Sequence, residues 1–411
     1  MTRVIFFGIL LLCLFACTPS EATLPQSEPS QSQKEAALPE VAGTTIHTPS
    51  TIPQQTATSA LPSPIPTETP GDNQEPVFFP LSELGQLVSG RRSYTFLDPA
   101  RQDRRVEVFV WYPAVQSEGQ AGDVVQDAPP DRTGAPYPVI LSSAKVAGLF
   151  GPHLVSYGFV VVGVRFLDTY EPWDFNLVDQ PLDILFALEQ VAAAPLERLD
   201  GMLDADRSGV MGYSFDGYNS LALSGARIAP NFYKQQCNNV HTKDPPLSEW
   251  RSWYFCDLAA RWDEFEDHAG SQLTVSDDGL WKPMTDQRIL AVMPMAPEGA
   301  WIFGERGLAE VDRPTLIIAA TEDKGDHFCP YDLEAVYIFE HLGTPQAGLI
   351  SFIGQGHMMI MQSEPLARMK HFAAAFFGYH LQGRNEYANY FSEEFINQFD
   401  DLAWGVYPVS E

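Results

Sequence analysis

The sequence predicts an α/β fold, built on a doubly wound, mainly parallel sheet with helices on both faces. Three observations support this prediction. Short apolar runs alternate with helix-like segments after residue 76. Several of these runs, such as residues 160–164, are apolar or glycine at every position, as expected for strands that are buried on both faces. Residues 76–411 are long enough to form one large core.

The predicted elements follow one another in a regular order. The strand candidates begin with an edge strand at residues 94–97 and continue at 105–112, 138–142, 159–166, 209–213, 289–296, 315–320 and 349–353. Helical patterns lie at 178–194, 217–226, 331–341 and 365–380. Strands that alternate with helices at these intervals indicate parallel β-α-β units.

The N-terminus predicts export and a lipid anchor. Arg3 precedes an apolar run, residues 4–15, that is too short to span a bilayer as a helix. This arrangement is typical of a secretory signal peptide, here residues 1–17. Leu14-Phe15-Ala16-Cys17 resembles the bacterial lipobox, in which the cysteine is lipid-modified and becomes the mature N-terminus. We therefore expect a protein of the bacterial cell envelope that is anchored to a membrane by acyl chains on Cys17. The alternative is an ordinary signal peptide with an incidental cysteine.

Residues 18–75 predict a disordered tether, and the charge of the chain restricts its partners. This segment has no Trp, Tyr or Phe and is rich in Ser, Thr and Pro, so it cannot bury enough apolar surface to fold. The formal net charge of the whole chain is −28, and most of it lies beyond the tether. Such a charge disfavours nucleic acid and anionic lipid headgroups as partners.

An aromatic-rich insertion interrupts the fold at about residues 230–285. It separates a helix from the next strand far more widely than is usual in β-α units. It also contains Cys237 and Cys256, whose pairing in an exported protein is as plausible as their being free thiols. We expect a cap over a binding cleft; the alternative is a surface subdomain with its own small core. The aromatic residues are Trp250, Trp253, Tyr254, Phe255, Trp262, Phe265 and Trp281.

A candidate nucleophile, Ser214, follows the strand at residues 209–213. Gly212-Tyr213-Ser214-Phe215-Asp216 matches two of the three specified positions of the nucleophile elbow G-x-S-x-G, with Asp216 in place of the second glycine. Gly212 suits the close backbone approach that such a sharp turn requires. A serine hydroxyl is a poor nucleophile unless a base takes its proton and an acid orients that base.

The base and the acid are expected after later strands, in the chain order serine, acid, histidine. Asp323 follows the strand at 315–320, and His357 follows the strand at 349–353 in a glycine-bracketed loop. Glu322 and Asp326 are the alternative acids, and His327 is the alternative base. The group Asp326, His327 and Cys329 could suggest a metal site, but its spacing fits no common one, and we expect no metal.

Six segments of the folded part carry a family resemblance: 90–94, 106–114 (ending Val-Trp-Tyr-Pro-Ala), 137–142, 156–162, 286–292 and 313–318. With them, the folded part resembles a branch of the α/β-hydrolase superfamily that contains platelet-activating-factor acetylhydrolases and bacterial dienelactone-hydrolase-like esterases. This resemblance implies an eight-stranded hydrolase sheet, a Ser214–Asp323–His357 triad, no cofactor, and hydrolysis of short-chain or phospholipid-type acyl esters. Dienelactone hydrolases use a cysteine nucleophile, so Ser214 favours the esterase side.

Two departures from this family concern the oxyanion hole. The family usually has Ser-His-Gly where this chain has Ser142-Ser143-Ala144. A backbone donor survives a change of side chain, so we expect Phe215 N–H and an N–H of Ala144 or Lys145 to bind the oxyanion. Asp216 suits the first turn of a helix, and we favour a structural role for it. If it faced the oxyanion instead, its charge would oppose catalysis.

The sequence therefore predicts a lipid-anchored serine esterase that acts on a small-molecule or lipid ester. The alternative is a catalytically silent, lipid-anchored binding protein that kept the fold, an interpretation supported by Asp216 and by the missing His-Gly pair. The ester itself and the oligomeric state are left open by the sequence.

Overall fold

The structure, a computed structural model, describes residues 78–116, 124–166, 173–193, 196–240, 248–324 and 329–408. The predicted signal peptide with Cys17 and the predicted tether at 18–75 lie outside these residues, as do Asp326 and His327. Within the described ranges, none of the helices has both the length and the apolar character needed to cross a membrane.

The described residues form one mixed sheet of ten strands in the order β10-β9-β8-β7-β6-β4-β5-β2-β1-β3. Its centre, from β5 to β9, is parallel throughout, whereas β2 runs antiparallel to both β5 and β1, and β10 runs antiparallel to β9. The strands are β1 (Val88–Asp98), β2 (Arg104–Ala114), β3 (Val125–Gln126), β4 (Tyr137–Ser143), β5 (Val160–Val164), β6 (Leu203–Tyr213), β7 (Ile289–Met295), β8 (Thr315–Ala320), β9 (Ala347–Phe352) and β10 (Leu402–Trp404).

The predicted α/β class with a mainly parallel sheet is confirmed, but the strand number differs from the expected eight. Each of the eight predicted strands has its counterpart in the sheet. The two additional strands, β3 and β10, are two and three residues long and lie at the two edges. Such short edge strands have no measurable hydrophobic period, so sequence patterns do not reveal them.

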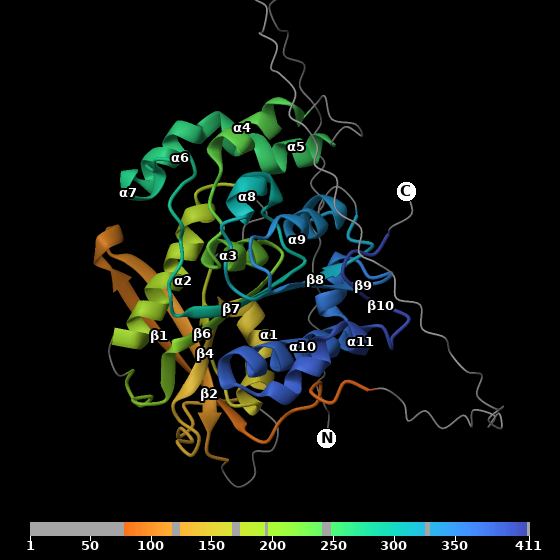
Figure 1. Ribbon diagram of the computed structural model, residues 1–411. Coiled ribbons are helices and arrows are strands. Elements are labelled where there is room, and N and C mark those ends of the chain that lie inside the picture. The colour runs from red at the N-terminus through yellow and green to blue at the C-terminus, as the bar shows by residue number, and fades with distance from the viewer. Residues whose placement is uncertain are drawn as a thin grey trace, which may run out of the picture. The chain divides into compact units, whose positions relative to one another are not determined.

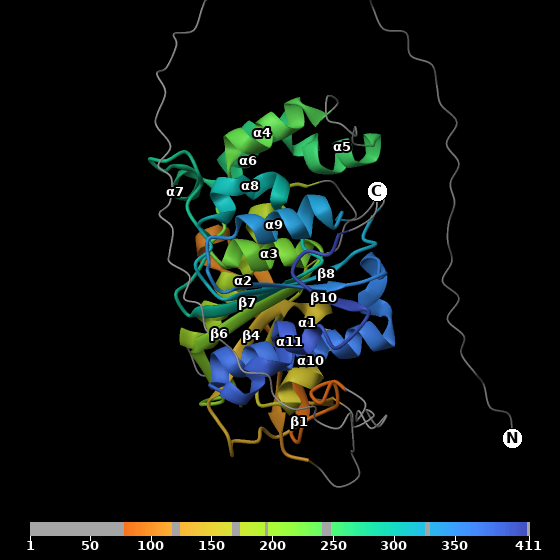
Figure 2. The same ribbon diagram turned by 45° about the vertical axis from the view of Figure 1, so that its right-hand side comes forward.

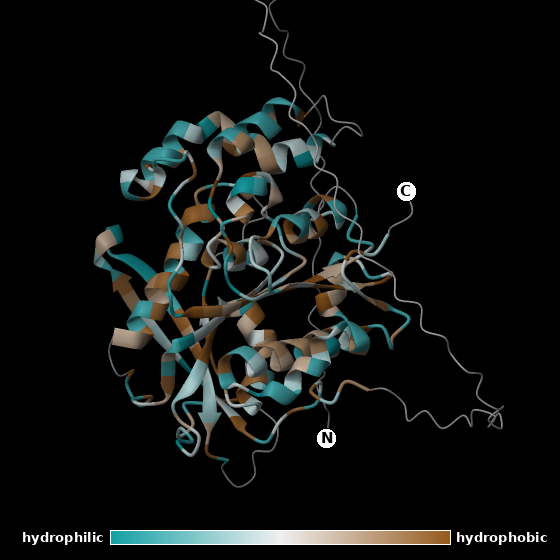
Figure 3. Ribbon diagram, viewed as in Figure 1, coloured by the Kyte–Doolittle hydropathy of each residue, from teal (hydrophilic) through white to brown (hydrophobic). Residues whose placement is uncertain are grey.

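Helices cover both faces of the sheet (Figures 1 and 2). α1, α10 and α11 lie on one face, and α2, α3, α8 and α9 lie on the other. Hydrophobic residues follow the central strands between these layers (Figure 3). The helices are α1 (Ala144–Ser156), α2 (Asn176–Ala193), α3 (Phe215–Leu223), α4 (Pro230–Asn238), α5 (Glu249–Cys256), α6 (Trp262–Ala269), α7 (Ser271–Thr274), α8 (Ala300–Leu308), α9 (Tyr337–His341), α10 (Ser363–Gln382) and α11 (Glu393–Ile396), with a π-helical turn η4 (Asp332–Val336) before α9 and 3₁₀ turns η1 (Pro99–Arg101), η3 (Asp257–Arg261), η5 (His357–Met361) and η6 (Asn385–Phe391).

The helices that were not predicted from the sequence include α1, which packs on the sheet, and α8, which packs on α4 and α9. α1 contains Gly151 and Pro152, residues that normally weaken a helical pattern. A Cβ atom on Gly151 would lie 3.1 Å from the ring of Trp111 in β2, so the glycine allows close packing on the sheet. α8 contains Gly304 with a positive φ of 58°, which bends it. Tertiary packing therefore overrides weak local propensity at both helices.

The insertion at 230–285 forms α4 to α7, which lie together beyond α3 and α8 (Figure 1). Its aromatic residues do not form a separate core. Trp262, Phe265 and Trp281 belong to the same buried cluster as Tyr218 of α3 and Phe303 of α8. The described residues, from 78 onwards, likewise belong to one compact unit. The insertion is therefore an integral layer of the domain, and Cys237 and Cys256, whose state the sequence left open, form a disulfide within it.

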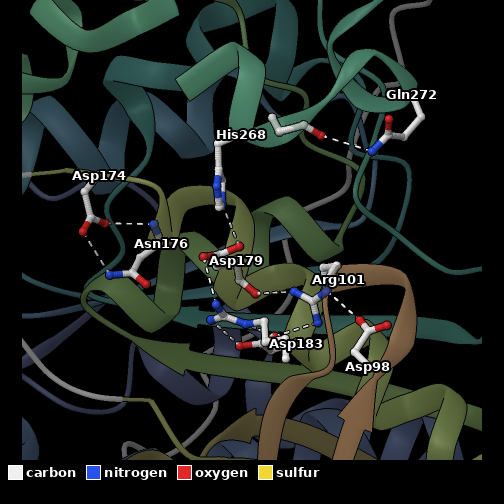
Figure 4. A network of polar contacts seen from close by, with 10 residues as sticks. Asp98, Arg101, Asp174, Asn176, Asp179, Asp183, His268 and Gln272 are labelled. Atoms are coloured by element: carbon white, nitrogen blue, oxygen red, sulfur yellow. Dashed lines mark hydrogen bonds and ion pairs between the residues drawn. The ribbon is translucent and has the colours of Figure 1, made fainter. Parts of the chain in front are cut away.

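A polar network joins helix α6 of the insertion to α2 and to the turn between β1 and β2 (Figure 4). His268 of α6 lies 3.0 Å from Asp179 of α2, and Asp179 also binds Arg104 at the start of β2 at 3.1 Å. The Arg104 guanidinium continues to Asp183 at 2.8 Å. Arg101 lies 2.6 Å from Asp98 and 2.7 Å from Asp183. A continuous series of polar contacts thus connects the β1–β2 turn, α2 and α6.

The segment before β1 is attached to α10 through a buried histidine. His371 is fully buried, and its Nδ1 accepts the Leu81 backbone N–H at 3.0 Å. Phe79 packs edge-on against the same ring and stacks on Phe399 with centroids 4.4 Å apart. Burial lowers the pKa of His371 to about 3. The histidine is therefore neutral in the folded protein at neutral pH.

We expect His371 to make the protein less stable in acid. The unfolded histidine binds a proton below about pH 6.5, but the folded one does not until about pH 3. The free energy of unfolding should therefore fall by about 1.4 kcal/mol per pH unit between these values on account of this residue. Urea unfolding at several pH values from 6.5 to 4.5 should show a shallower decline for His371→Gln. Equal slopes for the two proteins would contradict the assignment.

Candidate active site

Ser214 lies in a strained turn between β6 and α3. Its φ of 60° and ψ of −122° fall outside the regions that non-glycine residues prefer. A Cβ atom on Gly212 would come within 1.9 Å of the Asp216 carbonyl oxygen, which explains why glycine precedes the turn. The Ser214 N–H donates to the Met295 carbonyl oxygen of β7 at 2.9 Å, which ties the turn to the neighbouring strand.

The position of this turn follows from the sheet topology. The chain passes from β4 to β5 on one side of β4 and then to β6 on the other side. In open α/β sheets, the point at which the strand order reverses is where ligands bind, beyond the carboxyl ends of the strands. β4 and β6 are adjacent and parallel, so the turns that follow them lie at this point. Ser143 is the last residue of β4, and Ser214 lies in the turn after β6.

The structure brings together the three residues predicted as a triad. His357 Nε2 lies 3.0 Å from Ser214 Oγ, and His357 Nδ1 lies 2.7 Å from Asp323 Oδ2. The residues come from the turns after β6, β8 and β9, three parallel strands. The contacts fit a tautomer in which Nδ1–H donates to Asp323 and Nε2 accepts the serine hydroxyl proton. This arrangement can remove a proton from Ser214 and stabilise the resulting imidazolium.

The surroundings of the histidine and the aspartate hold them in place. The Tyr213 hydroxyl donates to the His357 carbonyl oxygen, and the two rings pack edge to face with centroids 5.4 Å apart. Asp323 is 2% exposed, and its carbonyl oxygen accepts the Tyr331 N–H at 3.0 Å. Burial raises the pKa of Asp323, whereas its hydrogen bond to His357 lowers it. The acid is therefore desolvated and directed at one partner, the imidazole.

The alternative acid and the other histidines that lie within the described residues make contacts outside the triad. Glu322 is exposed and pairs with Lys324 at 3.2 Å. Two of the other histidines on helices have partners of their own: His341 Nδ1 lies 2.7 Å from the Tyr337 carbonyl oxygen, and His371 Nδ1 accepts the Leu81 N–H. Asp326 and His327 lie outside the described residues. Elsewhere in the described ranges, no three His, Cys, Asp or Glu side chains gather in a group that could hold a metal ion.

Two helices begin at the site, and the backbone N–H groups at their N-termini can supply oxyanion donors. α1 starts at Ala144 directly after β4, and α3 starts at Phe215 directly after β6. The first backbone N–H groups of a helix have no acceptor within the helix and carry the positive end of its dipole. In α1, the Val146 N–H is accepted by Ser143 Oγ at 3.3 Å. The N–H groups of Phe215 and Ala144 are thus the suitable pair, with Lys145, an exposed residue, next in α1.

The two departures from the family pattern contact each other. Ser143 Oγ donates to Asp216 Oδ2 at 2.5 Å. Asn219 Nδ2 lies 3.4 Å from the other carboxylate oxygen and 2.8 Å from Gln180 Oε1. Asp216 is therefore engaged at the base of α3, in agreement with the structural role favoured from the sequence. Its contact with Ser143 joins the start of α3 to the start of α1.

We expect Ser143→Ala and Asp216→Ala each to lower the free energy of unfolding by about 1–3 kcal/mol, because each removes one partner of a charge-assisted hydrogen bond. The double variant should lose little more than the larger single loss. The control is Ser392→Ala, which removes a comparable helix cap at α11 that has no carboxylate partner. The stability that it loses should add fully to the loss caused by Asp216→Ala. Chemical denaturation of the wild type, the three single variants and the two double variants measures these differences, and full additivity of Ser143→Ala and Asp216→Ala would exclude the coupling.

Sequence reasoning missed a buried carboxylate beside the nucleophile. Glu298 follows β7, the strand next to β6, and is 5% exposed. Its backbone N–H donates to the Ser214 carbonyl oxygen at 3.4 Å. Burial raises the pKa of Glu298, whereas hydrogen bonds from Trp173, Cys329 and Tyr254 lower it. Its place at the carboxyl end of a central strand, like that of Asp323, was a signal that could have identified it.

Comparisons with known proteins add no information on this site. No model of a known protein family matches the chain, and no curated protein shows significant similarity to it.

Proposed function

We propose that this protein is a serine hydrolase of the α/β-hydrolase fold that cleaves carboxylic esters through an acyl-enzyme at Ser214. The observation that carries the proposal is the hydrogen-bonded series Ser214 Oγ, His357 Nε2, His357 Nδ1 and Asp323 Oδ2, with contacts of 3.0 and 2.7 Å. The strained φ of 60° at Ser214 supports it, because strain of this kind is typical of functional sites.

The reaction proceeds in two halves. Ser214 Oγ attacks the ester carbonyl carbon while His357 Nε2 takes the hydroxyl proton. The oxyanion is held by the N–H groups of Phe215 and of Ala144 or Lys145. The alcohol leaves with the proton from His357, and the acyl group stays on Ser214. Water then attacks the acyl-enzyme, His357 takes and returns its proton, and the carboxylic acid is released. The residues require no cofactor or metal for these steps.

The aromatic residues of the insertion support a substrate class. Aromatic side chains suit an apolar acyl or alcohol group, and on this ground we propose a short-chain or phospholipid-type ester. The Ser143–Asp216 contact supports an active enzyme over a silent binding protein, because it gives the unusual carboxylate a partner other than the oxyanion.

Fluorophosphonate labelling of the full-length protein in detergent tests this proposal. The reagent forms a covalent bond with an activated serine, and we expect peptide mapping to locate it on Ser214. Ser214→Ala serves as the control and should not label. A folded wild-type protein that does not react would contradict the proposal and favour the binding protein.

We further propose that the protein is exported to the bacterial cell envelope and anchored to a membrane through lipid on Cys17. Cys17→Ser should leave the chain without acyl chains, so the protein should move from the detergent phase to the aqueous phase on phase separation. Equal partitioning of the two proteins would contradict the anchor but not the hydrolase.

A further inference from the structure

Glu298 lies in a segment that is packed directly on the nucleophile turn. Its N–H donates to the Ser214 carbonyl oxygen at 3.4 Å, and Ser214 donates in return to Met295 at 2.9 Å. A Cβ atom on Gly217 would lie 2.8 Å from Pro297 Cα, so the two turns are in close contact there as well. The backbone around Glu298 is therefore held at a fixed distance from Ser214.

The side chain of Glu298 joins this segment to two others. Its Oε2 accepts the indole N–H of Trp173 at 2.9 Å. The Tyr254 hydroxyl lies 3.2 Å from Oε2 and 3.3 Å from Oε1. Trp173 and Tyr254 also bind each other, because the Trp173 backbone N–H donates to the Tyr254 carbonyl oxygen at 2.9 Å. Trp173 precedes α2, and Tyr254 belongs to α5 of the insertion. One carboxylate thus connects α5, the start of α2 and the nucleophile turn.

A buried carboxylate at this position needs a physical reason. Removing its charge from water is costly, and an apolar side chain of similar size would pack there at a lower cost. The proposed proton transfer does not use Glu298, since the His357 Nδ1 contact is made by Asp323. A carboxylate does offer what an apolar side chain lacks, namely two acceptor oxygens that can hold donors from two separate segments.

We infer that Glu298 is a positioning residue that seats helix α5 over the nucleophile turn and thereby sets how tightly the acyl or alcohol group of the ester is bound. The inference rests on the proposed function of the same site.

Helix α5 is suited to such a role because it carries aromatic side chains and is held at its end. Trp250 stacks on Tyr254 with centroids 4.9 Å apart, and Phe255 stacks on Trp301 of α8 at 5.5 Å. Cys256, the last residue of α5, is bonded to Cys237 of α4. These contacts fix one end and one face of the helix. The Tyr254–Glu298 contact then determines the position of α5 relative to Ser214.

The test is a double-mutant cycle on Glu298 and Tyr254. Glu298→Gln keeps the shape but replaces one acceptor oxygen with an N–H₂ group, which cannot accept a hydrogen bond from Trp173 or Tyr254. We expect KM for p-nitrophenyl esters to rise about tenfold, with kcat changed less than about threefold. Tyr254→Phe and Trp173→Phe each remove one donor and should raise KM in the same way. In Glu298→Gln/Tyr254→Phe both changes remove the same Tyr254–Glu298 hydrogen bond, so KM should not exceed that of Glu298→Gln.

The control is Tyr112→Phe, which removes a buried tyrosine hydroxyl that donates to the Ala128 carbonyl oxygen at 2.7 Å, away from the insertion. Any effect of Tyr112→Phe on KM should multiply with that of Glu298→Gln, as expected for two independent sites. The rate of Ser214 labelling by a small fluorophosphonate should be the same in all of these proteins, because that reagent does not need the groups held by α5.

The outcomes separate the inference from the proposed function. No labelling of the folded wild-type protein would overturn the proposed function itself. If the wild type labels, unchanged KM values in Glu298→Gln, Tyr254→Phe and Trp173→Phe overturn the positioning role. Losses in kcat and in labelling rate as large as the change in KM also overturn it, since they would assign Glu298 to the chemical step. Should Glu298→Gln not fold, the Tyr254→Phe and Trp173→Phe variants decide the question alone.

Discussion

Ser214→Ala is expected to lower the turnover of an ester substrate by about 10⁶-fold, because the proposed acyl-enzyme forms on this hydroxyl. His357→Ala should cause a loss of similar size, and the double variant should be no worse than either single variant. Residues that act as one unit show this non-additivity, and the contacts of 3.0 and 2.7 Å along the series indicate such a unit. Steady-state kinetics of the four proteins measure these losses.

The matched control for this series is Ser224→Ala. Ser224 follows α3, the helix that Ser214 precedes, and its buried hydroxyl donates to the Leu221 carbonyl oxygen at 2.6 Å. Its loss should affect stability and leave turnover within a few-fold of the wild type. More than about a hundredth of wild-type activity in purified Ser214→Ala would exclude this serine as the nucleophile.

Asp323→Asn is expected to lower turnover by about 10⁴-fold while leaving the structure intact. An asparagine amide can donate to His357 Nδ1, which places the ring proton on Nε2. That nitrogen can then no longer accept the proton of Ser214, whose Oγ lies 3.0 Å away. The same measurement of kcat with a p-nitrophenyl ester checks this result.

Glu322→Gln provides the comparison for the acid. Glu322 is adjacent in sequence but exposed and paired with Lys324, so its neutralisation should leave turnover nearly unchanged. A loss in Glu322→Gln as large as that in Asp323→Asn would reverse the assignment of the acid. Retention of more than about a tenth of the activity in Asp323→Asn would show that the imidazole is oriented by another group.

Much of the fold could be predicted from the sequence because it depends on local patterns. The apolar runs at β4, β5 and β8 are continuous, and burial on both faces of a parallel sheet requires this pattern. The turn at Ser214 was predictable from Gly212, since a side chain there would collide with the Asp216 carbonyl oxygen. Once the order of strands was known, the positions of Asp323 and His357 followed from the rule that parallel strands end at one edge.

The parts that were missed depend on contacts between residues far apart in the chain. Ser143 and Asp216 are 73 positions apart, and Trp173 and Glu298 are 125 positions apart. No local pattern indicates that the Asp216 carboxylate accepts the hydroxyl of Ser143, or that Glu298 accepts an indole N–H. Helix α1 was missed for a related reason, since Gly151 weakens the helix locally but lets it approach Trp111.

Ser214 illustrates this division. Its motif and the strand before it follow from a few neighbouring residues, because backbone sterics and hydrophobic periodicity act over short distances. Its partners follow from the sheet, which brings His357, 143 positions away, within hydrogen-bonding distance. The role of Asp216 belongs to the second group. Its carboxylate is near the nucleophile in sequence, yet its partner is Ser143, because the parallel pairing of β4 with β6 brings the ends of these two strands together.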